Sequence, residues 1–213
     1  MSLEPKFNIA AGKATAKLAT HFRRLKPTHV ILIFIGALGL MAGIELSMGR
    51  LFFGPDGRFG FWETSIWSSE NSQRLADPYS FSHIVHGIAF YGLLWLVARK
   101  LPVEKRLLIA LSVEVGWELL ENSPIIINRY REATVALGYT GDSVMNSMSD
   151  VLMMTLGFLF ARWAKPVISL VAVAMMEIGC ALWVRDNLTL NIIMLIHPVD
   201  AIKHWQLAGQ PHP

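Results

Sequence analysis

The chain has 213 residues, of which 53% are hydrophobic and only 16% are charged, and its formal net charge is +3. Soluble globular domains carry about 25% charged residues, and the mean hydropathy of this chain is +0.42. Composition therefore excludes an ordinary soluble domain and predicts one compact membrane domain whose partners are membrane lipids. The single cysteine, Cys180, excludes an internal disulfide and a Cys-based zinc cluster, and no pattern indicates nucleic-acid binding.

Five stretches approach the roughly 20 apolar residues with which a helix crosses the hydrocarbon core. In chain order they are Thr28 to Met48, Phe81 to Ala98, Leu107 to Ile127, Ser143 to Ala161, and Val167 to Val184. A sixth apolar run, Leu188 to Ile196, is too short to span, so we expect an interfacial or re-entrant piece there. The predicted fold is all-α, a polytopic integral membrane bundle of about five transmembrane helices.

The distribution of Lys and Arg predicts the orientation of this bundle. If the five spans alternate, twelve of the 19 Lys and Arg residues lie on the side of the N-terminus. The positive-inside rule places that side in the cytoplasm. We therefore expect a basic cytoplasmic segment over residues 1–27, a transmembrane domain over 28–184 and an extracytoplasmic segment over 185–213. The stretch Lys6 to Lys26 suits either an amphipathic helix on anionic lipid or a basic tail that only sets orientation.

Polar residues form stripes on three consecutive spans. The second span carries His83 and His86, the third carries Glu114, Glu118, Glu121 and Asn122, and the fourth carries Asp142, Asn146 and Asp150. Residues three and four positions apart share one helix face, and ionisable residues in spans usually face the bundle interior. With alternating spans, the stripes reach a similar depth in the outer half. We predict one polar site that opens to the outer face.

Several carboxylates with no Lys or Arg among them repel one another in a low dielectric. Shared protons, a bound cation or charged histidines would relieve that repulsion. Histidine together with Asp and Glu is a suitable ligand set for zinc, manganese or iron, and a bound divalent metal can activate water. In this hypothesis the metal ligands are His83, His86, Glu118, Asn146 and Asp150. The predicted catalytic residues are Glu118, Glu121 and Asp150, and the predicted supporting residues are Glu114, Asn122 and Asp142.

A purely structural interpretation stays open for the residues at the helix ends. Asp142 follows Gly141 and is a candidate N-cap of the fourth span. His83 and His86 lie at the start of the second span, where polar side chains can cap a helix or reach the headgroups.

The same residues carry a resemblance to a known family. The segments Ser82-His83-Ile84-Val85-His86-Gly87, Glu114 to Pro124 and Gly138 to Asp150 resemble the bacterial inner-membrane proteins described as family DUF-2585, or UPF-0314. The likeness covers most of the chain from the first span to the fifth and implies a bacterial plasma-membrane location, but no function. A looser likeness to VanZ-like membrane proteins rests on a histidine in one helix, a Glu-rich helix next and a Gly-Asp-x-x-x-Asn pattern after it.

Three functions stay open at this point. The leading hypothesis is a metal-dependent membrane enzyme, a hydrolase of a lipid or envelope precursor. One alternative is a proton- or cation-coupled transporter, which the apolar inner halves of the spans, such as Gly92 to Val97, disfavour. The other is a non-catalytic accessory subunit of a membrane complex, docked through the small-residue face Gly39-x-x-x-Gly43.

Overall fold

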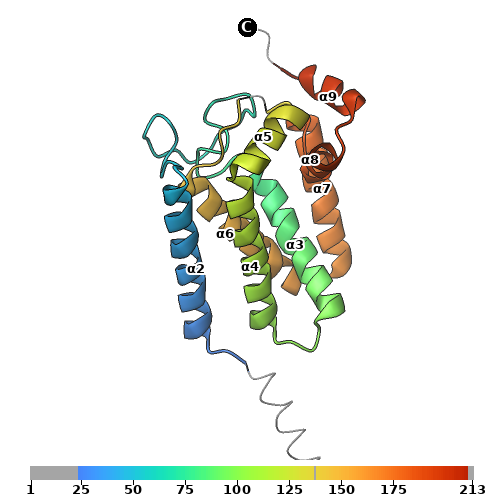
Figure 1. The fold of residues 1–213 in the computed structure, drawn as a ribbon. Coiled ribbons are helices and arrows are strands. Elements are labelled where there is room, and N and C mark those ends of the chain that lie inside the picture. Colours follow the sequence, from blue (N-terminus) through green and yellow to red (C-terminus); the bar gives the residue numbers. More distant parts are fainter. Residues whose placement is uncertain (1–23, 137, 211–213) are drawn as a thin grey trace, which may run out of the picture.

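The computed structural model describes residues 24–136 and 138–210, so the segment from Lys6 to Arg23 lies outside the described residues. The described chain folds into helices that run up and down, with shorter helices and a long loop at one end (Figure 1). The helices are α2 (Pro27–Ser47), α3 (Ser80–Val97), α4 (Val103–Glu121), α5 (Pro124–Ala133), α6 (Val144–Trp163), α7 (Pro166–Val184), α8 (Leu188–Ile196) and α9 (Asp200–Leu207).

Four of these helices, α2, α3, α6 and α7, are long and apolar enough to cross a membrane. Their bounds agree with four of the expected spans to within two residues, which confirms the all-α membrane bundle. Proline begins α2 and α7, where its fixed φ suits the first helical turn and its missing N–H leaves no helical hydrogen bond unmade. The short run from Leu188 to Ile196 forms α8, as its length predicted.

The expected third span, Leu107 to Ile127, is wrong as a single helix. The structure ends α4 at Glu121, holds Ser123 in an extended conformation and starts α5 at Pro124. Proline disfavours helical geometry in the residue before it, which is why the helix stops there. Helix α4 still runs beside α2 and α3 (Figure 1), although it falls outside the set of strongly apolar helices. Helix α5 therefore lies at the end of the bundle, close to the polar residues.

Helix α6 is the central helix, and it packs most closely on α3. A Cβ added to Gly87 would clash with the Met154 carbonyl oxygen, and one added to Gly157 would clash with the Ile84 carbonyl oxygen. These two glycines let the backbones of α3 and α6 approach closely. Gly39 and Gly43 have open space around them, so the motif expected to pack helices is not used within the described chain.

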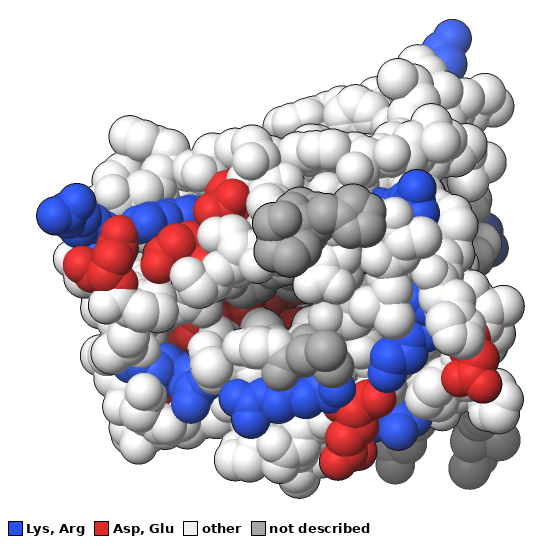
Figure 2. Space-filling model, turned by 90° about the horizontal axis from the view of Figure 1, so that it is seen from above, with Lys and Arg blue, Asp and Glu red and all other residues white. Residues whose placement is uncertain are grey.

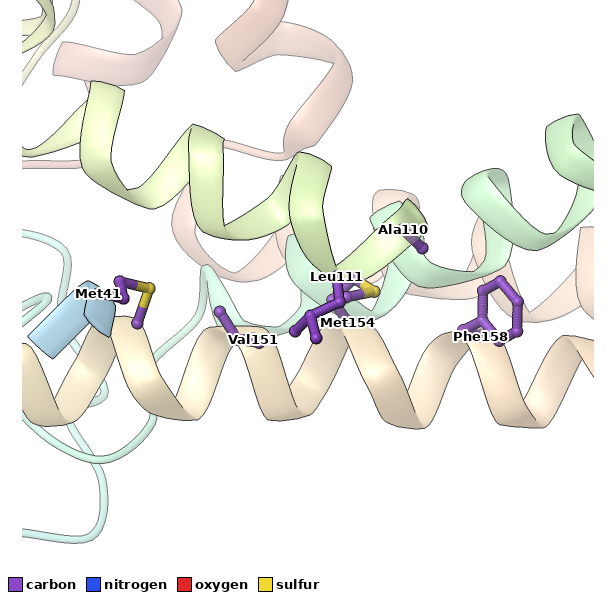
Figure 3. Packing of buried hydrophobic residues seen from close by; sticks show 6 residues of the cluster. All are labelled: Met41, Ala110, Leu111, Val151, Met154 and Phe158. Atoms are coloured by element: carbon purple, nitrogen blue, oxygen red, sulfur yellow. The ribbon is translucent and has the colours of Figure 1, made fainter. Parts of the chain in front are cut away.

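An apolar core lies between α2, α4 and α6 (Figure 3). Its members precede Glu114 on α4 and follow Asp150 on α6. Its buried members are Met41, Ala110, Leu111, Val151, Met154 and Phe158. Large apolar side chains on the outer faces of α2, α3 and α7 are exposed. Such exposure is costly in water but suits contact with lipid tails, so the helices present lipid-facing surfaces.

Candidate functional site

A cavity of about 370 Å³ lies at the end of the bundle where α5 and α8 sit. Seen from that end, acidic side chains lie on the floor of a central hollow, and Lys and Arg side chains lie around it (Figure 2). The polar lining includes His83, His86, Glu114, Glu121, Asp142, Asn146 and Asp150. The structure thus brings residues of all three predicted stripes to one cavity, whereas Glu118 and Asn122 are buried and are not part of its lining.

Glu114 joins the two histidines of α3 to α4. Its Oε1 atom lies 2.6 Å from His83 Nδ1 and 3.1 Å from His86 Nδ1. The arrangement fits an ionised Glu114 that accepts a hydrogen bond from each Nδ1, because a carboxylate can only accept. That assignment leaves the Nε2 atom of each ring available as a ligand.

Glu118 lies one helical turn beyond Glu114 and is fully buried. Neither of its oxygens has a hydrogen-bond partner in the described part of the chain, and Oε1 lies 3.4 Å from His83 Nδ1. Asp150 approaches from α6, with Oδ2 at 3.7 Å from His83 Nε2 and Oδ1 accepting from Ser80 Oγ at 3.3 Å. Two helices, α4 and α6, therefore bring carboxylates to one histidine of α3.

Glu121 and Asp142 form the second half of the site, and a tyrosine holds each of them. Tyr130 donates to Glu121 Oε1, and Tyr139 donates to Asp142 Oδ1, both at 2.9 Å. Burial raises the pKa of the Asp142 carboxyl to about 7, while the Tyr139 hydroxyl acts in the opposite direction. Asp142 thus lies between its neutral and ionised forms near neutral pH.

Two asparagines make structural hydrogen bonds at the same place. Asn122 Oδ1 accepts from the Asp142 backbone N–H at 2.7 Å, and its Nδ2 donates to Ser147 Oγ at 3.1 Å. Asn146 Nδ2 donates to the Arg74 carbonyl at 2.9 Å, and the residue lines the cavity.

The expected N-cap of the fourth span, Asp142, is wrong. Ser143 caps α6 instead, because its hydroxyl accepts from the Asn146 backbone N–H at 3.2 Å. Asp142, one residue earlier, is too far from the helix start for this bond and turns its carboxylate to Tyr139. Its side chain is thereby free to take part in the polar site.

Among residues 24–136 and 138–210, three sets of side chains have ligand atoms close enough together to hold a metal ion. They are His83 with His86 and Glu114, His83 with Glu118 and Asp150, and Glu118 with Glu121 and Asp142. Within each set, all of the ligand atoms lie within 4.8 Å of one another. Of the expected ligands, His83, His86, Glu118 and Asp150 occur in these sets of His, Asp and Glu side chains, and Asn146 lines the same cavity.

Sequence reasoning missed the tyrosines and the apolar wall of the cavity. Tyr130 lies in α5, beyond the break after Glu121, and Tyr139 lies in the loop before α6. No helical spacing therefore connects either tyrosine to its carboxylate partner. The wall comes from Phe90, Val113 and Trp117 together with Leu188, Ile192 and Leu195 of α8. Only the apolar character of α8 could have indicated that it borders a site.

These features define the class of the protein: a helical membrane protein with a buried His and carboxylate cluster beside an amphiphilic cavity at one end of the bundle. The chain belongs to the family described as "Protein of unknown function (DUF2585)", whose model matches residues 45–208.

Relatives that bear the name UPF0314 protein support this membership. One from Rhizobium johnstonii is 49% identical over 79% of this chain and 87% of its own length. One from Sphingopyxis alaskensis is 47% identical over 84% of this chain and 95% of its own length. No solved structure matches the chain. The comparisons thus support the DUF-2585 resemblance, and the likeness to VanZ-like proteins stays a matter of short motifs.

Proposed function

We propose that this protein is a metal-dependent enzyme of the bacterial inner membrane, a hydrolase of a lipid or lipid-linked envelope precursor. The observation that carries the proposal is the state of Glu118. Its carboxylate is fully buried, lacks a hydrogen-bond partner in the described residues and lies in a ligand set with His83 and Asp150. A buried charge without compensation is strongly unfavourable, and a bound cation supplies the compensation.

The ligands in this proposal come from three helices. His83 and His86 would bind through Nε2, Glu118 and Asp150 through carboxylate oxygens, and Asn146 through its amide oxygen. The contacts of Glu114 with both Nδ1 atoms support this arrangement. Metal-ligating histidines almost always donate their other ring N–H to a carboxylate, a carbonyl or water, which fixes the ring orientation.

The lining of the cavity supports an amphiphilic substrate. Polar side chains occupy its floor, whereas Phe90, Val113 and Trp117 continue the lining along α3 and α4. Phe90 lies one turn beyond His86 in the direction of the apolar core, and Val113 is exposed on the outside of α4. A polar headgroup would rest at the carboxylates, and its hydrocarbon chain would extend along these apolar residues.

Hydrolysis at this site would add one water across an ester or phosphoester bond. The hydroxyl of water would bond to the carbonyl carbon or phosphorus, and its second hydrogen would end on the departing oxygen. A bound divalent metal would lower the pKa of its bound water and polarise the substrate oxygen. Asp150 and Glu121 both line the cavity and are placed to accept and return the proton.

Two further features support an outward-facing enzyme over a transporter. The positive-inside rule assigns the N-terminus to the cytoplasm, and with α4 counted as a span the cavity faces the opposite side. Beyond the polar floor, α4 and α6 continue into the apolar core with Leu111, Val151 and Met154 fully or almost fully buried. A hydrated path for ions would have to cross that core.

The test is the metal content of the full-length protein purified in detergent, measured by mass spectrometry beside the Glu118→Ala/Asp150→Ala double variant. We expect bound metal in the natural protein and its loss in the double variant. A Glu132→Ala variant is the matched control, because Glu132 is exposed and does not line the cavity. Absence of metal from the natural protein after incubation with zinc, manganese and iron salts would overturn the proposal.

A further inference from the structure

We propose that the cavity holds two divalent cations, with the Glu118 carboxylate bridging them. This inference rests on the proposed function and adds a second metal site to it. The first cation would lie between His83, Asp150 and Glu118, and the second between Glu121, Asp142 and Glu118.

Glu118 is the residue that the two ligand sets share. It belongs to one set with His83 and Asp150, and to another with Glu121 and Asp142. Both of its oxygens are buried, and neither has a hydrogen-bond partner in the described segments. A carboxylate has two oxygens that can each bind a different ion, so a single buried Glu at the junction of two sets is placed to bridge.

The remaining ligands are oriented by hydrogen bonds from outside each set. Glu114 contacts the Nδ1 atoms of His83 and His86 on one side. Tyr130 and Tyr139 donate to Glu121 and Asp142 on the other, and each tyrosine uses one carboxylate oxygen. The second oxygen of Asp142 also accepts a long hydrogen bond from Asn122 Nδ2, at 3.5 Å. A carboxylate oxygen has more than one lone pair, so both carboxylates can still bind a cation beside these hydrogen bonds. Hydrogen bonds of this kind hold ligands in place around metals.

The number of carboxylates in the cluster also favours more than one divalent ion. Five carboxylates gather here, from Glu114, Glu118, Glu121, Asp142 and Asp150. Within the described chain, the basic side chains that form ion pairs with them are His83 and His86. When all five carboxylates are ionised, one divalent cation neutralises fewer than half of their charges, whereas two neutralise most of them.

The two positions differ in the ions that they favour. Imidazole with carboxylates suits zinc, manganese or iron, while a set of carboxylate oxygens suits manganese or magnesium. Manganese fits both, and a pair of ions about 3.5–4 Å apart can stabilise both the attacking and the leaving oxygen of a displacement. This arrangement matches a substrate that carries a phosphate, since each ion can contact one phosphate oxygen.

The experiment uses the full-length protein in detergent, stripped of metal with a chelator and dialysed against Mn²⁺. We expect two equivalents of Mn²⁺ per chain and an electron paramagnetic resonance spectrum with exchange coupling between two ions. The Glu121→Gln/Asp142→Asn double variant should retain one equivalent with the spectrum of an isolated ion. A Glu132→Gln variant should behave as the natural protein does.

The outcomes separate this inference from the proposed function. One equivalent of uncoupled Mn²⁺ in the natural protein would overturn the second site and leave a mononuclear enzyme. No bound Mn²⁺, zinc or iron would overturn both proposals. Two equivalents that persist uncoupled in the double variant would place the second ion elsewhere and overturn the bridging role of Glu118. The measurements on the natural protein decide the matter even if the double variant fails to fold.

Discussion

At the scale of single residues, the proposed site assigns Glu114 the role of orienting two histidines without binding the metal. Its Oε1 atom meets both histidines of α3, while its own side chain is completely buried. We expect Glu114→Gln to weaken metal binding about 10- to 100-fold, the usual effect of removing a residue that orients ligands. A competition titration against a fluorescent chelator would measure it.

The matched control for that prediction is Glu132→Gln, which changes an exposed carboxylate on α5. An unchanged affinity in Glu114→Gln would show that the histidines keep their orientation without the charge. It would also remove Glu114 from the supporting role that the sequence predicted.

A second residue, Asp186, lies outside the site, and we expect it to make the free energy of unfolding depend on pH. Burial raises the pKa of its carboxyl to about 6, although Tyr79 donates to it at 3.0 Å and lowers the pKa, while the charge of Glu177 raises it. A raised pKa means that the folded state holds the proton more tightly than the unfolded state. The stabilisation is therefore complete below about pH 4 and is lost as the pH rises through about 6.

This change corresponds to about 3 kcal/mol of unfolding free energy. We expect thermal unfolding in detergent to show a smaller decline between pH 4 and pH 7 for Asp186→Asn than for the natural protein. The Asn side chain keeps an acceptor for Tyr79 or for Gln206, which donates to Asp186 at 3.0 Å. Parallel stability curves for the two proteins would contradict the prediction.

At the scale of elements, the contact between α3 and α6 depends on two glycines. Gly87 and Gly157 each face a backbone carbonyl of the other helix, with no room for a Cβ. We expect Gly87→Ala to destabilise the protein by about 1–3 kcal/mol or more, because an added methyl group must push the backbones apart. It should also weaken metal binding, since His83 and Asp150 sit on these two helices. Thermal unfolding and metal titration would measure both effects.

Helix α2, which is also apolar enough to cross a membrane, supplies a control glycine. Gly39→Ala introduces the same methyl group where nothing lies within 4 Å, so we expect little loss of stability in the isolated protein. Equal destabilisation by the two substitutions would show that close approach of α3 and α6 is not the cause, since helix propensity favours alanine over glycine at both positions.

Elements were predictable where hydrophobicity alone decides them. The bounds of α2, α3, α6 and α7 follow from predominantly apolar runs that end near a charged residue or proline. The break between α4 and α5 was missed because Ile125 to Ile127 prolongs the apolar run beyond Pro124, and proline can either kink a helix or begin a new one. Close packing was assigned to Gly39 and Gly43, because sequence spacing does not reveal which glycines meet another backbone.

The candidate site was predictable to the extent that helix periodicity fixes it. The spacing of Glu114, Glu118 and Glu121 places them on one face, and alternation of the spans brings that face near His83 and Asp150. Contacts made by loop residues could not be predicted from helix periodicity. Tyr139 reaches Asp142 through a turn, and Ser143 takes the capping role because the chain enters α6 one residue later than Asp142 suggests.

At the scale of the whole molecule, the proposals require that the cavity opens on the outer side of the inner membrane. Helices α5 and α8, which border the cavity, lie at the opposite end of the bundle from the 98–102 loop (Figure 1), so labelling at the two ends distinguishes the orientations. The buried Cys180 is the single cysteine, so a Cys180→Ser background gives a chain into which one reporter can be placed. Glu132→Cys reports on the cavity end, and Lys100→Cys reports on the opposite end.

We expect a membrane-impermeant maleimide to label Glu132→Cys in intact spheroplasts and to label Lys100→Cys only after the membrane is permeabilised. Both positions are exposed, so burial does not prevent either reaction. Removing one charge at Lys100 leaves most basic residues on the same side, and the positive-inside asymmetry persists. The reverse pattern would place the cavity in the cytoplasm, and an enzyme there would meet lipid precursors before export. Labelling of both positions in intact spheroplasts would contradict a membrane-spanning bundle between the two ends.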